Sequence, residues 1–559
     1  MNISEVDYAI IILYLAGIVG MGIWAGRQRK KGGEGRHYFL AGNTLTWPVI
    51  GLAMFAANIS TVHLVSLAES AYKYGLIYGN FEWMAGFTLV LLSLFFAPLY
   101  LRSKVPTLPD YLERRYSRKC RDWLAIVSII SAIVIHIGVA LYTAAWVLRG
   151  ITGLPPDATI FGIDALFFFI AILGILTGIY TMIGGLLAVV MTESVQTVLL
   201  LIGALCITVV GYIKIGGWSA LVNTLATHPH PMQNVAGSGI TWGTGNFLHM
   251  MRFNGDPSGL PWYSILLGYP VLGIWYWCAD QTIVQRVLAA KDETQARLGP
   301  LFCALLKILP VFLFVLPGVI CVALVQNHAF GGAAPEATAD TYTFMIMHLL
   351  PVGLKGLIAA AMLAAAMQTC SGALNSTATL FAFDIFKRYR PATTDHSLVV
   401  IGKITTVVAT VLAIVLSPIF GHYSTIIEGL NKLISYIAPP ITAVFLFGVF
   451  WRKATGRAAY TTLVTGAVIG FGMFLLDWNG IYQGNFMMTA FYLLVLCSVI
   501  IVAVSLWRPE ELKDEAKELV WENWREPLMR KFDGTLMSNY KLFAGLVVGA
   551  FIVLYYIFR

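Results

Sequence analysis

The feature that most constrains this fold is a succession of apolar segments, each about as long as a membrane-spanning helix. A helix needs ~20 apolar residues to cross the hydrocarbon core of a bilayer. Hydrophobic residues make up 58% of the 559-residue chain and charged residues only 12%, about half the charged share of soluble domains. The sequence therefore predicts an all-α polytopic membrane protein with about 14 spans, at roughly 8–26, 47–71, 78–100, 123–150, 160–182, 186–213, 262–285, 300–325, 354–383, 398–418, 426–450, 458–476, 486–507 and 541–558.

Basic residues are concentrated in alternate connections between the predicted spans. Short basic loops favour the cytoplasmic side of a membrane. Both termini are therefore predicted to be extracellular or periplasmic, in a plasma or inner membrane. The net charge of +8 comes from these loops and does not indicate a nucleic-acid partner. Most of the 37 lysines and arginines lie in 27–36, 102–121, 286–297, 387–403, 452–457 and 508–541.

Two connections are long. Residues 214–261 contain the sequence His228-Pro229-His230-Pro231, which we interpret as solvated loop rather than a metal site because nothing fixes a ligand geometry. Residues 508–540 mix acidic residues with Trp521 and Trp524, and we interpret them as a cytoplasmic amphipathic helix on the membrane surface. Neither connection is large enough for an enzymatic domain.

Two predicted spans carry polar or aromatic residues at mid-depth. The second span contains Phe55-Ala56-Ala57-Asn58-Ile59-Ser60-Thr61-Val62-His63, and the seventh contains Gly273-Ile274-Trp275-Tyr276-Trp277-Cys278-Ala279-Asp280-Gln281. Polar groups at this depth are costly unless they face a partner, a cavity or a ligand. Paired interrupted helices in corresponding positions of two five-helix halves are typical of transporters with a site between inverted repeats.

Among the ionisable residues inside the predicted spans, the sharpest signal comes from Glu82, Glu193, Asp280 and Lys307. Intramembrane charges usually mark substrate or ion pathways. For Asp280 an ion pair with the nearby Arg286 is an equally good interpretation. A carboxylate and an ammonium, grouped with amide, imidazole and aromatic side chains, suit a neutral, hydroxyl-rich ligand. The residues of this set are Asn58, His63, Glu82, Lys307 and Asn431.

The ninth span has several side-chain oxygens between Ala364 and Thr377. Together with carbonyls from a broken second span they offer the oxygen ligands that a hard cation prefers. Small-residue helix packing explains the same pattern, and spacing alone does not decide between the two. No nucleophile–base pair or metal-ligand cluster indicates an enzyme.

The chain resembles the sodium–solute symporters, and within them the sodium–glucose cotransporter branch. The similarity runs from about residue 8 to 452 and is weaker in the last three spans. The motifs that carry it are Tyr38-Phe39-Leu40-Ala41-Gly42, Phe81-Glu82-Trp83, Gly184-Gly185-Leu186 with Gln196-Thr197, Trp275-Tyr276-Trp277-Cys278-Ala279-Asp280-Gln281-Thr282-Ile283-Val284-Gln285-Arg286, Leu374-Asn375-Ser376 with Asp384-Ile385, and Ser435-Tyr436-Ile437-Ala438-Pro439-Pro440.

The resemblance implies a LeuT-type fold of 14 helices, with a 5+5 inverted repeat in helices two to eleven. It divides the chain into a first peripheral helix and loop (1–46), a first repeat (47–251), a second repeat (252–452) and peripheral C-terminal helices (453–559). It implies sodium-coupled import of a monosaccharide or polyol by a protein that functions as a monomer, with sodium as coupling ion and no other cofactor.

The family's sugar contacts fall on Asn58, His63, Glu82 and Lys307, with Tyr276 as the aromatic inner gate and Trp277 beside it. Asn431 replaces a glutamine that is usual in the family, so the resemblance implies a changed ligand preference. The outer gate of the family corresponds to Leu67, Phe81 and Ile427.

The resemblance also implies a sodium site. Its carbonyl ligands fall on Ala56, Ile59 and Ala365, and the family's consecutive serines are Gln368 and Thr369 here. Glu193 stands where the family usually has an aspartate near the inner exit of the ion. Because Gln368 is not a serine, an uncoupled or proton-driven carrier, or a sugar-gated sensor, remains an alternative on the same fold.

Overall fold

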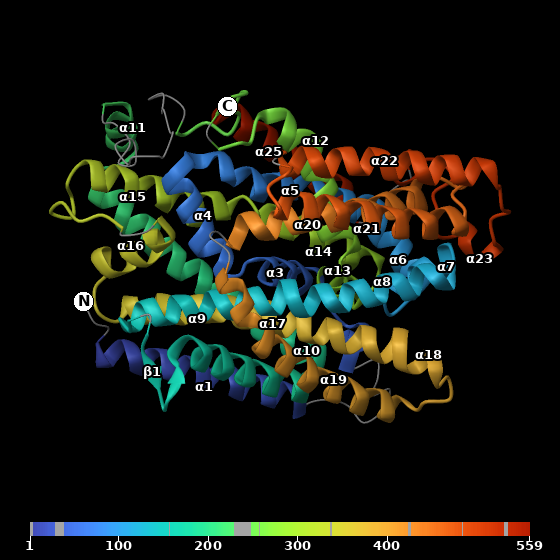
Figure 1. Ribbon diagram of the computed structural model, residues 1–559, viewed down its shortest axis with the longest axis horizontal. Coiled ribbons are helices and arrows are strands. Elements are labelled where there is room, and N and C mark those ends of the chain that lie inside the picture. Colours follow the sequence, from blue (N-terminus) through green and yellow to red (C-terminus); the bar gives the residue numbers. More distant parts are fainter. Residues whose placement is uncertain are drawn as a thin grey trace.

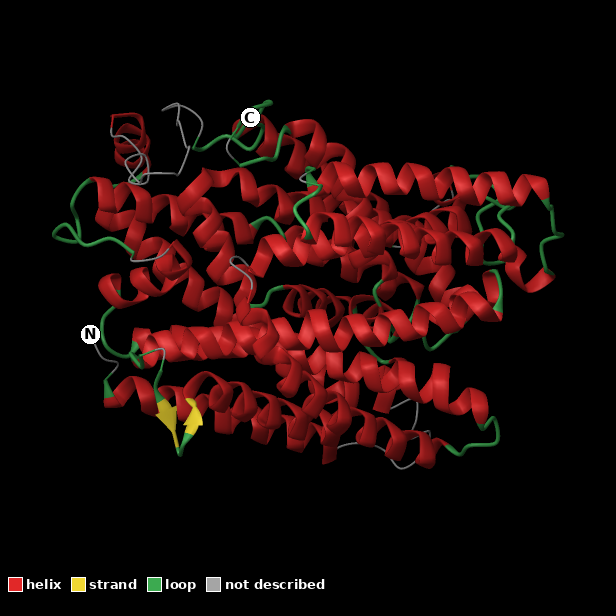
Figure 2. Cartoon of the chain, viewed as in Figure 1, coloured by secondary structure: helices red, strands yellow, loops and turns green. Residues whose placement is uncertain are grey.

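The structure is a computed structural model that describes residues 4–27, 38–155, 157–227, 247–256, 258–335, 338–422, 426–482, 484–529 and 535–559. This part of the chain is a bundle of long helices lying side by side (Figure 2). Its strands are β1 (Thr159–Ile160) and β2 (Ile163–Asp164), which form one antiparallel hairpin. The predicted all-α class is therefore confirmed. The segment His228-Pro229-His230-Pro231 lies outside the described residues.

Helices up to residue 227 include one pair, α3 and α4, that together fill one predicted span. They are α1 (Glu5–Arg27), η1 (Ala41–Asn43), α3 (Trp47–Asn58), α4 (Thr61–Tyr74), η2 (Gly75–Gly79), α5 (Asn80–Leu91), η3 (Leu92–Phe96), α6 (Ala97–Ser103), α7 (Leu108–Arg115), α8 (Arg118–Ser131), η4 (Ala132–Gly138), α9 (Val139–Thr152), α10 (Ala165–Ile215) and α11 (Trp218–Thr227).

Helices after residue 247 continue the bundle. They are α12 (Trp262–Ile274), η5 (Trp275–Ala279), α13 (Gln281–Leu288), α14 (Glu293–Leu306), η6 (Val311–Val315), α15 (Leu316–Gln326), η7 (Thr338–Asp340), α16 (Thr341–Leu349), α17 (Leu354–Leu380), η8 (Phe381–Phe386), α18 (Lys387–Tyr389), α19 (Asp395–Leu416), η9 (Ser417–His422), α20 (Ile426–Phe450), α21 (Gly456–Trp478), α22 (Phe486–Trp507), α23 (Asp514–Lys517), α24 (Glu526–Met529), η10 (Leu536–Ser538) and α25 (Tyr540–Ile557).

Eleven of the described helices are long and apolar enough to cross a membrane, so the count of 14 stays a prediction. Four of the predicted spans explain the difference. The second span is interrupted, and its first piece, Trp47–Asn58, is short. The seventh span is interrupted too, and its first helix, α12, has 13 residues. The two spans predicted at 160–182 and 186–213 fall within α10, which has 51 residues. A straight helix of that length would be ~77 Å long, far more than the ~30 Å hydrocarbon core.

Gly185 breaks α10 into two segments. Its φ of 62° and ψ of −160° are not helical, and this conformation is essentially restricted to glycine. A Cβ at this position would also sit 2.5 Å from the carbonyl oxygen of Tyr38. The glycine therefore permits both the break and the close approach of the segment that precedes α3.

The predicted interruptions of the second and seventh spans are present. Helix α3 ends at Asn58, and Ile59 and Ser60 are extended before α4 begins at Thr61. In the second interruption, α12 continues through the π-helical segment η5 and stops at Asp280, which has φ −86° and ψ 125°. One carboxylate oxygen of Asp280 accepts a 2.7 Å hydrogen bond from the Thr282 backbone N–H and so caps α13. Both breaks are thus stabilised by local side-chain bonds.

The prediction of one amphipathic helix over 508–540 is wrong. Within its described residues the connection contains single-turn helices, α23 and α24. The Trp521 ring is 2% exposed, and its indole N–H donates to the Phe95 carbonyl at 3.0 Å. The backbone N–H of Trp521 donates to the Val449 carbonyl, also at 3.0 Å. Of the two tryptophans that suggested a membrane surface, Trp521 is therefore buried against the helix bundle, while Trp524 is 56% exposed.

Helices from distant parts of the sequence meet at the two ends of the bundle. In Figure 1, α7, α18 and α23, which belong to basic connections, lie at the right-hand end. The N-terminus, α11 and α16 lie at the opposite end. The three basic connections that contain these helices thus lie at one end of the bundle, as the charge pattern predicts.

We expect Gly185→Ala to lower the stability of the protein by ~1–3 kcal/mol, because alanine cannot adopt the Gly185 conformation without strain. Thermal unfolding of the detergent-solubilised protein measures this. Gly472→Ala is the control, since nothing lies within 4 Å of the added Cβ in that helix. Equal melting temperatures for the two variants would contradict the role of Gly185.

Candidate functional site

A cavity lies at the first interruption, between α3, α4, α5, η4, η5 and α20. Its volume is about 180 Å³, far more than the ~10–15 Å³ of the same measure that one water requires. Most of its surface is aromatic or aliphatic, with a few polar groups converging on it, which is typical of small-molecule sites. The polar and charged side chains of its lining are Asn58, Ser60, His63, Glu82, His136, Lys307, Thr369 and Asn431.

Lys307 joins three helices at this cavity. Its ammonium donates to the amide oxygen of Asn58, the last residue of α3, and to a carboxylate oxygen of Glu82 on α5 at 2.5 Å. The Lys307 and Glu82 side chains are only 1% and 2% exposed. Charges so deeply buried are tolerated only when they are paired and hydrogen-bonded. The cluster is electrically neutral and presents both donors and acceptors.

Aromatic rings surround the ammonium of Lys307. The nitrogen lies 5.3 Å from the centroid of the Trp277 ring and 5.7 Å from that of Phe55. Both distances fall within the ~6 Å range of a cation–π contact. The Tyr276 ring is 5.1 Å from Trp277, so the polar cluster and the aromatic wall of the cavity form one packed unit.

His63 caps the helix that follows the first break. The Ser60 backbone N–H donates to Nδ1 of His63 at 3.3 Å, and the Ser60 hydroxyl is 3.0 Å from the same nitrogen. An Nδ1 that accepts a backbone N–H bond carries no proton, which leaves the proton on Nε2. This arrangement is a capping box in which histidine replaces the usual Glu or Gln. His63 therefore offers an N–H donor to the cavity.

The same capping box leaves two backbone carbonyls without their helical partners. In an unbroken helix the Ala56 carbonyl would accept from Ser60 N–H, but that group donates to His63. The Ile59 carbonyl would accept from His63 N–H, which instead donates to the Ser60 carbonyl at 2.9 Å. Carbonyls at a helix break are free to bind a cation.

α17 faces these carbonyls. The hydroxyl of Thr61, just past the break, donates to the Met362 carbonyl of α17 at 2.7 Å. Thr369 lies one to two turns further along α17 and lines the cavity. The Gln368 amide nitrogen donates to the Glu193 carbonyl at 3.4 Å, while its amide oxygen is buried with no partner among the described residues. The donor set consists of oxygens, which suits a hard cation such as sodium.

A model of the sodium:solute symporter family matches residues 38–466 of this chain. The chain belongs to this family. The family consists of membrane transporters rather than enzymes, and the predicted membership is confirmed.

Three known proteins show how far the similarity of this symporter extends. The sodium/glucose cotransporter 2 of Rattus norvegicus is 33% identical, covering 84% of this chain and 71% of the relative. The sodium/myo-inositol cotransporter 2 of Oryctolagus cuniculus is 30% identical, covering 94% of this chain and 80% of the relative. A solved structure of a Na⁺-coupled sialic acid symporter, in a substrate-bound outward-open state, has a TM-score of 0.75 with 20% identity and covers 91% of this chain and all of that one. The last likeness establishes the shared fold.

The structure of this symporter brings most of the predicted site residues together, although their roles remain predictions. The seven predicted sugar-contact residues and two of the gate residues line the one cavity. Ile427 lies in the first turn of α20, and its side chain is outside the described part of the structure. The lining residues are Asn58, His63, Leu67, Phe81, Glu82, Tyr276, Trp277, Lys307 and Asn431.

The suggested ion pair between Asp280 and Arg286 is wrong. The second carboxylate oxygen of Asp280 lies 3.3 Å from Nε2 of His136, whereas Arg286 forms a close ion pair with Glu193. One carboxylate oxygen of Asp280 caps the first turn of α13, whereas Arg286 lies in the last turn of that helix and reaches Glu193 on α10. The Glu193 and Arg286 side chains are 0% and 1% exposed, so Glu193, predicted to lie near the ion exit, is fully paired in this state.

His136 lines the cavity but was absent from the predicted site. It lies in the π-helical segment η4, within the fourth predicted span. The rule that singled out the other intramembrane ionisable residues applies equally to a histidine in a span. A search of all spans for histidine would have found it.

Breaking the buried pair of Lys307 and Glu82 from one side should destabilise the protein more than removing both charges. A lone buried charge costs ~3–5 kcal/mol, whereas apolar replacement of both partners is often neutral. We therefore expect Glu82→Leu and Lys307→Met each to lower the melting temperature, and the double variant to recover much of the loss. Lys517→Met, at an exposed pair, serves as the control and should change little. Additive losses in the double variant would contradict the coupling.

Proposed function

We propose that this chain is a secondary active transporter that couples sodium entry to import of a monosaccharide, of glucose or galactose type, or of a related polyol. The observation that most supports this proposal is the break at Ile59 and Ser60. It places the polar cavity next to the carbonyls of Ala56 and Ile59, which lack their helical hydrogen-bond donors. The relatives named for glucose and myo-inositol transport support this substrate class.

The cavity chemistry fits a neutral, hydroxyl-rich ligand. Glu82 accepts hydrogen bonds, Lys307 donates up to three, and Asn58 does both. Since the Lys307–Glu82 pair has no net charge, the cavity does not favour an anion or a cation as its organic substrate. Tyr276 and Trp277 provide flat apolar faces on which the C–H side of a sugar ring stacks. Asn431 and the Nε2–H of His63 complete the proposed contacts.

The proposed sodium ligands lie next to the sugar contacts. They are the carbonyls of Ala56, Ile59 and Ala365, the Thr369 hydroxyl and the amide oxygen of Gln368. The Thr369 hydroxyl donates to the Ala365 carbonyl at 3.2 Å, which leaves lone pairs on both oxygens. The amide nitrogen of Gln368 is bonded to Glu193, and this bond fixes which end of the amide is free.

One broken helix therefore contacts both solutes, and this proximity is the basis for coupling. Bound sodium favours the outward-open state, sugar closes an outer gate of Leu67, Phe81 and Ile427, and rocking of residues 47–251 against 252–452 moves the inner gate at Tyr276. A monomer suffices. Segments 1–46 and 453–559 are peripheral, and the basic end of the bundle faces the cytoplasm, with both termini outside the cell.

The proposal is tested by uptake of radiolabelled glucose, galactose and inositol into proteoliposomes. A tenfold sodium gradient supplies ~1.4 kcal/mol per ion, and a potential of 100 mV supplies ~2.3 kcal/mol per charge. Together these let one sodium ion concentrate sugar up to ~500-fold. We expect accumulation in sodium and none in potassium. Sugar that only equilibrates, whatever the cation, would establish the uncoupled alternative.

A second experiment isolates Gln368. Gln368→Leu keeps most of the side-chain volume but removes the oxygen, so the sodium concentration for half-maximal uptake should rise ~10-fold, the equivalent of ~1.4 kcal/mol. Gln368→Ser should retain sodium dependence through its hydroxyl. Met367→Leu is the control, because Met367 packs against Ile18 and Tyr180 on another face. Unchanged sodium dependence in Gln368→Leu would exclude the amide oxygen as a ligand.

A further inference from the structure

α17 and its continuation η8 carry buried polar atoms that the mechanism above does not use. The Asn375 amide nitrogen and oxygen, the Ser376 hydroxyl and one carboxylate oxygen of Asp384 have no hydrogen-bond partner among the described residues. Each of these side chains is about 1% exposed. Buried polar atoms are nearly always satisfied by protein, water or ligand. Several unsatisfied atoms along one helix therefore indicate water or an ion beside it.

Helix geometry places these atoms in line with the proposed sodium site. Thr369 and Ser376 are seven residues apart, and such residues lie ~20° apart around an α-helix. Ser376 and Asp384 are eight apart, but η8 is π-helical, and a π-turn inserts one extra residue. Asp384 therefore occupies the position that a seven-residue spacing would have reached. The three oxygens follow one face of α17 and span ~22 Å at 1.5 Å per residue.

An ion pair lies across this face between the first two oxygens. Gly372 is on the same face, three residues after Thr369. A Cβ on Gly372 would sit 2.6 Å from an Arg286 guanidinium nitrogen and 3.2 Å from a Glu193 carboxylate oxygen. The Arg286–Glu193 pair thus packs directly on α17 at this glycine, and a guanidinium in that position repels a passing cation.

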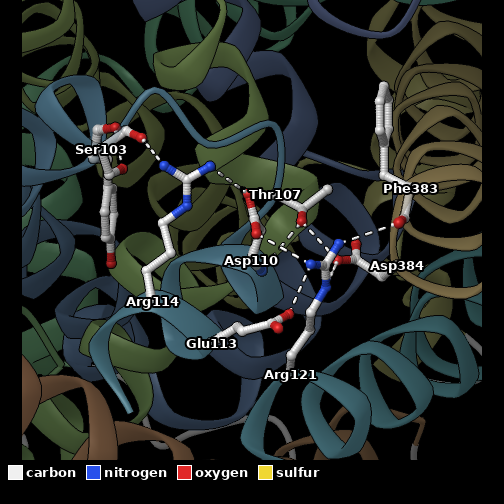
Figure 3. A network of polar contacts seen from close by, with 9 residues as sticks. Ser103, Thr107, Asp110, Glu113, Arg114, Arg121, Phe383 and Asp384 are labelled. Atoms are coloured by element: carbon white, nitrogen blue, oxygen red, sulfur yellow. Dashed lines mark hydrogen bonds and ion pairs between the residues drawn. The ribbon is translucent and has the colours of Figure 1, made fainter. Parts of the chain in front are cut away.

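The line of oxygens ends at an open, charged region. The bonded oxygen of Asp384 accepts from Arg121 Nε at 2.7 Å and from the Thr107 hydroxyl at 3.0 Å. Arg121 also pairs with Asp110 and Glu113 (Figure 3). Arg121 and its two carboxylate partners line a cavity of about 860 Å³ at the basic end of the bundle. Seven basic and three acidic side chains line this cavity, and the carboxylates beside Arg121 are the oxygen ligands that it offers to a cation.

We propose that sodium leaves its site along this face of α17, past Ser376 to Asp384, and that the Arg286–Glu193 pair at Gly372 closes the route. The proposal rests on the proposed sodium coupling and adds a path and a gate to it. The Asn375 amide lies beside the route and provides a further oxygen. Glu193 then holds Arg286 in the position that blocks the route, instead of serving as a free carboxylate at the exit.

The position of Arg286 connects this closure to the sugar gate. Tyr276 precedes the break at Asp280, and Arg286 follows it on α13. A hinge motion at this break changes the orientation of α13 relative to Tyr276, and a swing of α13 away from α17 removes the guanidinium from Gly372. Release of sugar and release of sodium are then steps of the same hinge motion.

Accessibility to a small cationic thiol reagent tests the path. We expect Ser376→Cys to react with 2-aminoethyl methanethiosulfonate at least ~10-fold faster than Thr377→Cys, because a buried thiol outside a wet path has no contact with the reagent. Thr377 is the matched control, since its hydroxyl bonds back to the Ala373 carbonyl at 2.9 Å. Peptide mass spectrometry separates these sites from the seven native cysteines. Sodium should slow the reaction relative to potassium.

Equal reaction rates at the two positions, or a Ser376→Cys rate that ignores sodium, would overturn the path. Asn375→Leu provides a second test that needs no thiol. It should slow ²²Na⁺ efflux from proteoliposomes ~10-fold while the sodium-induced thermal shift of the protein is retained. Undiminished efflux would also overturn the proposal. Failure of sodium coupling itself would appear separately, as sugar uptake in the unmodified protein that ignores sodium.

Discussion

The hydrogen bonds between Ser60 and His63 are the interaction on which the site depends. A capping box normally satisfies the free N–H groups of a new helix. Here it also occupies the two N–H groups that would have bonded Ala56 and Ile59, so the preceding carbonyls remain free inside the bundle. The break would otherwise leave unpaired donors at membrane depth, where each costs several kcal/mol. One local motif thus stabilises the interruption and produces its binding groups.

The Lys307 cluster performs the complementary task of joining separate helices around the cavity. Asn58 and Glu82 come from the first predicted repeat, and Lys307 comes from the second. Because the ammonium is buried and its bonds span the two halves, separating them exposes or unpairs a charge. The side chains of Lys307, Glu82 and Asn58 therefore hold the two halves together around the cavity, and the same side chains are available to a ligand. A ligand that replaces one of these bonds can change the preferred arrangement of the halves without a long-range pathway.

Sequence reasoning located the broken helices, the polar cluster and the basic end, because each depends on the cost of polar groups in lipid. Sequence reasoning failed where the partner of a side chain depends on how the helices are oriented in the folded protein. Asp280 is six residues from Arg286 but pairs with His136, since the break turns its carboxylate toward η4. Arg286 pairs with Glu193, 93 residues away. The sequence alone does not show whether Trp521 lies at a membrane surface or in a groove of the protein. Its hydrogen bonds to the Phe95 and Val449 carbonyls place it in the groove. The helix count also depends on geometry, because the break at Gly185 lies inside one continuous element.

The two interrupted helices play parallel parts in this molecule. In the first, Asn58 faces the cavity, and the carbonyls of Ala56 and Ile59 are the proposed sodium ligands. In the second, Tyr276 and Trp277 face the cavity while Arg286 packs on α17 at Gly372. Each break therefore has one group directed at the organic ligand and another at the proposed sodium site or its exit route. The first break contributes the negative partial charge of its carbonyls to the proposed ion site, and the second contributes the positive charge of Arg286. A motion that brings the carbonyls of the first break toward α17 and withdraws Arg286 raises the affinity for a cation, although the ligands themselves stay the same. This is the simplest electrostatic form of coupling between two sites.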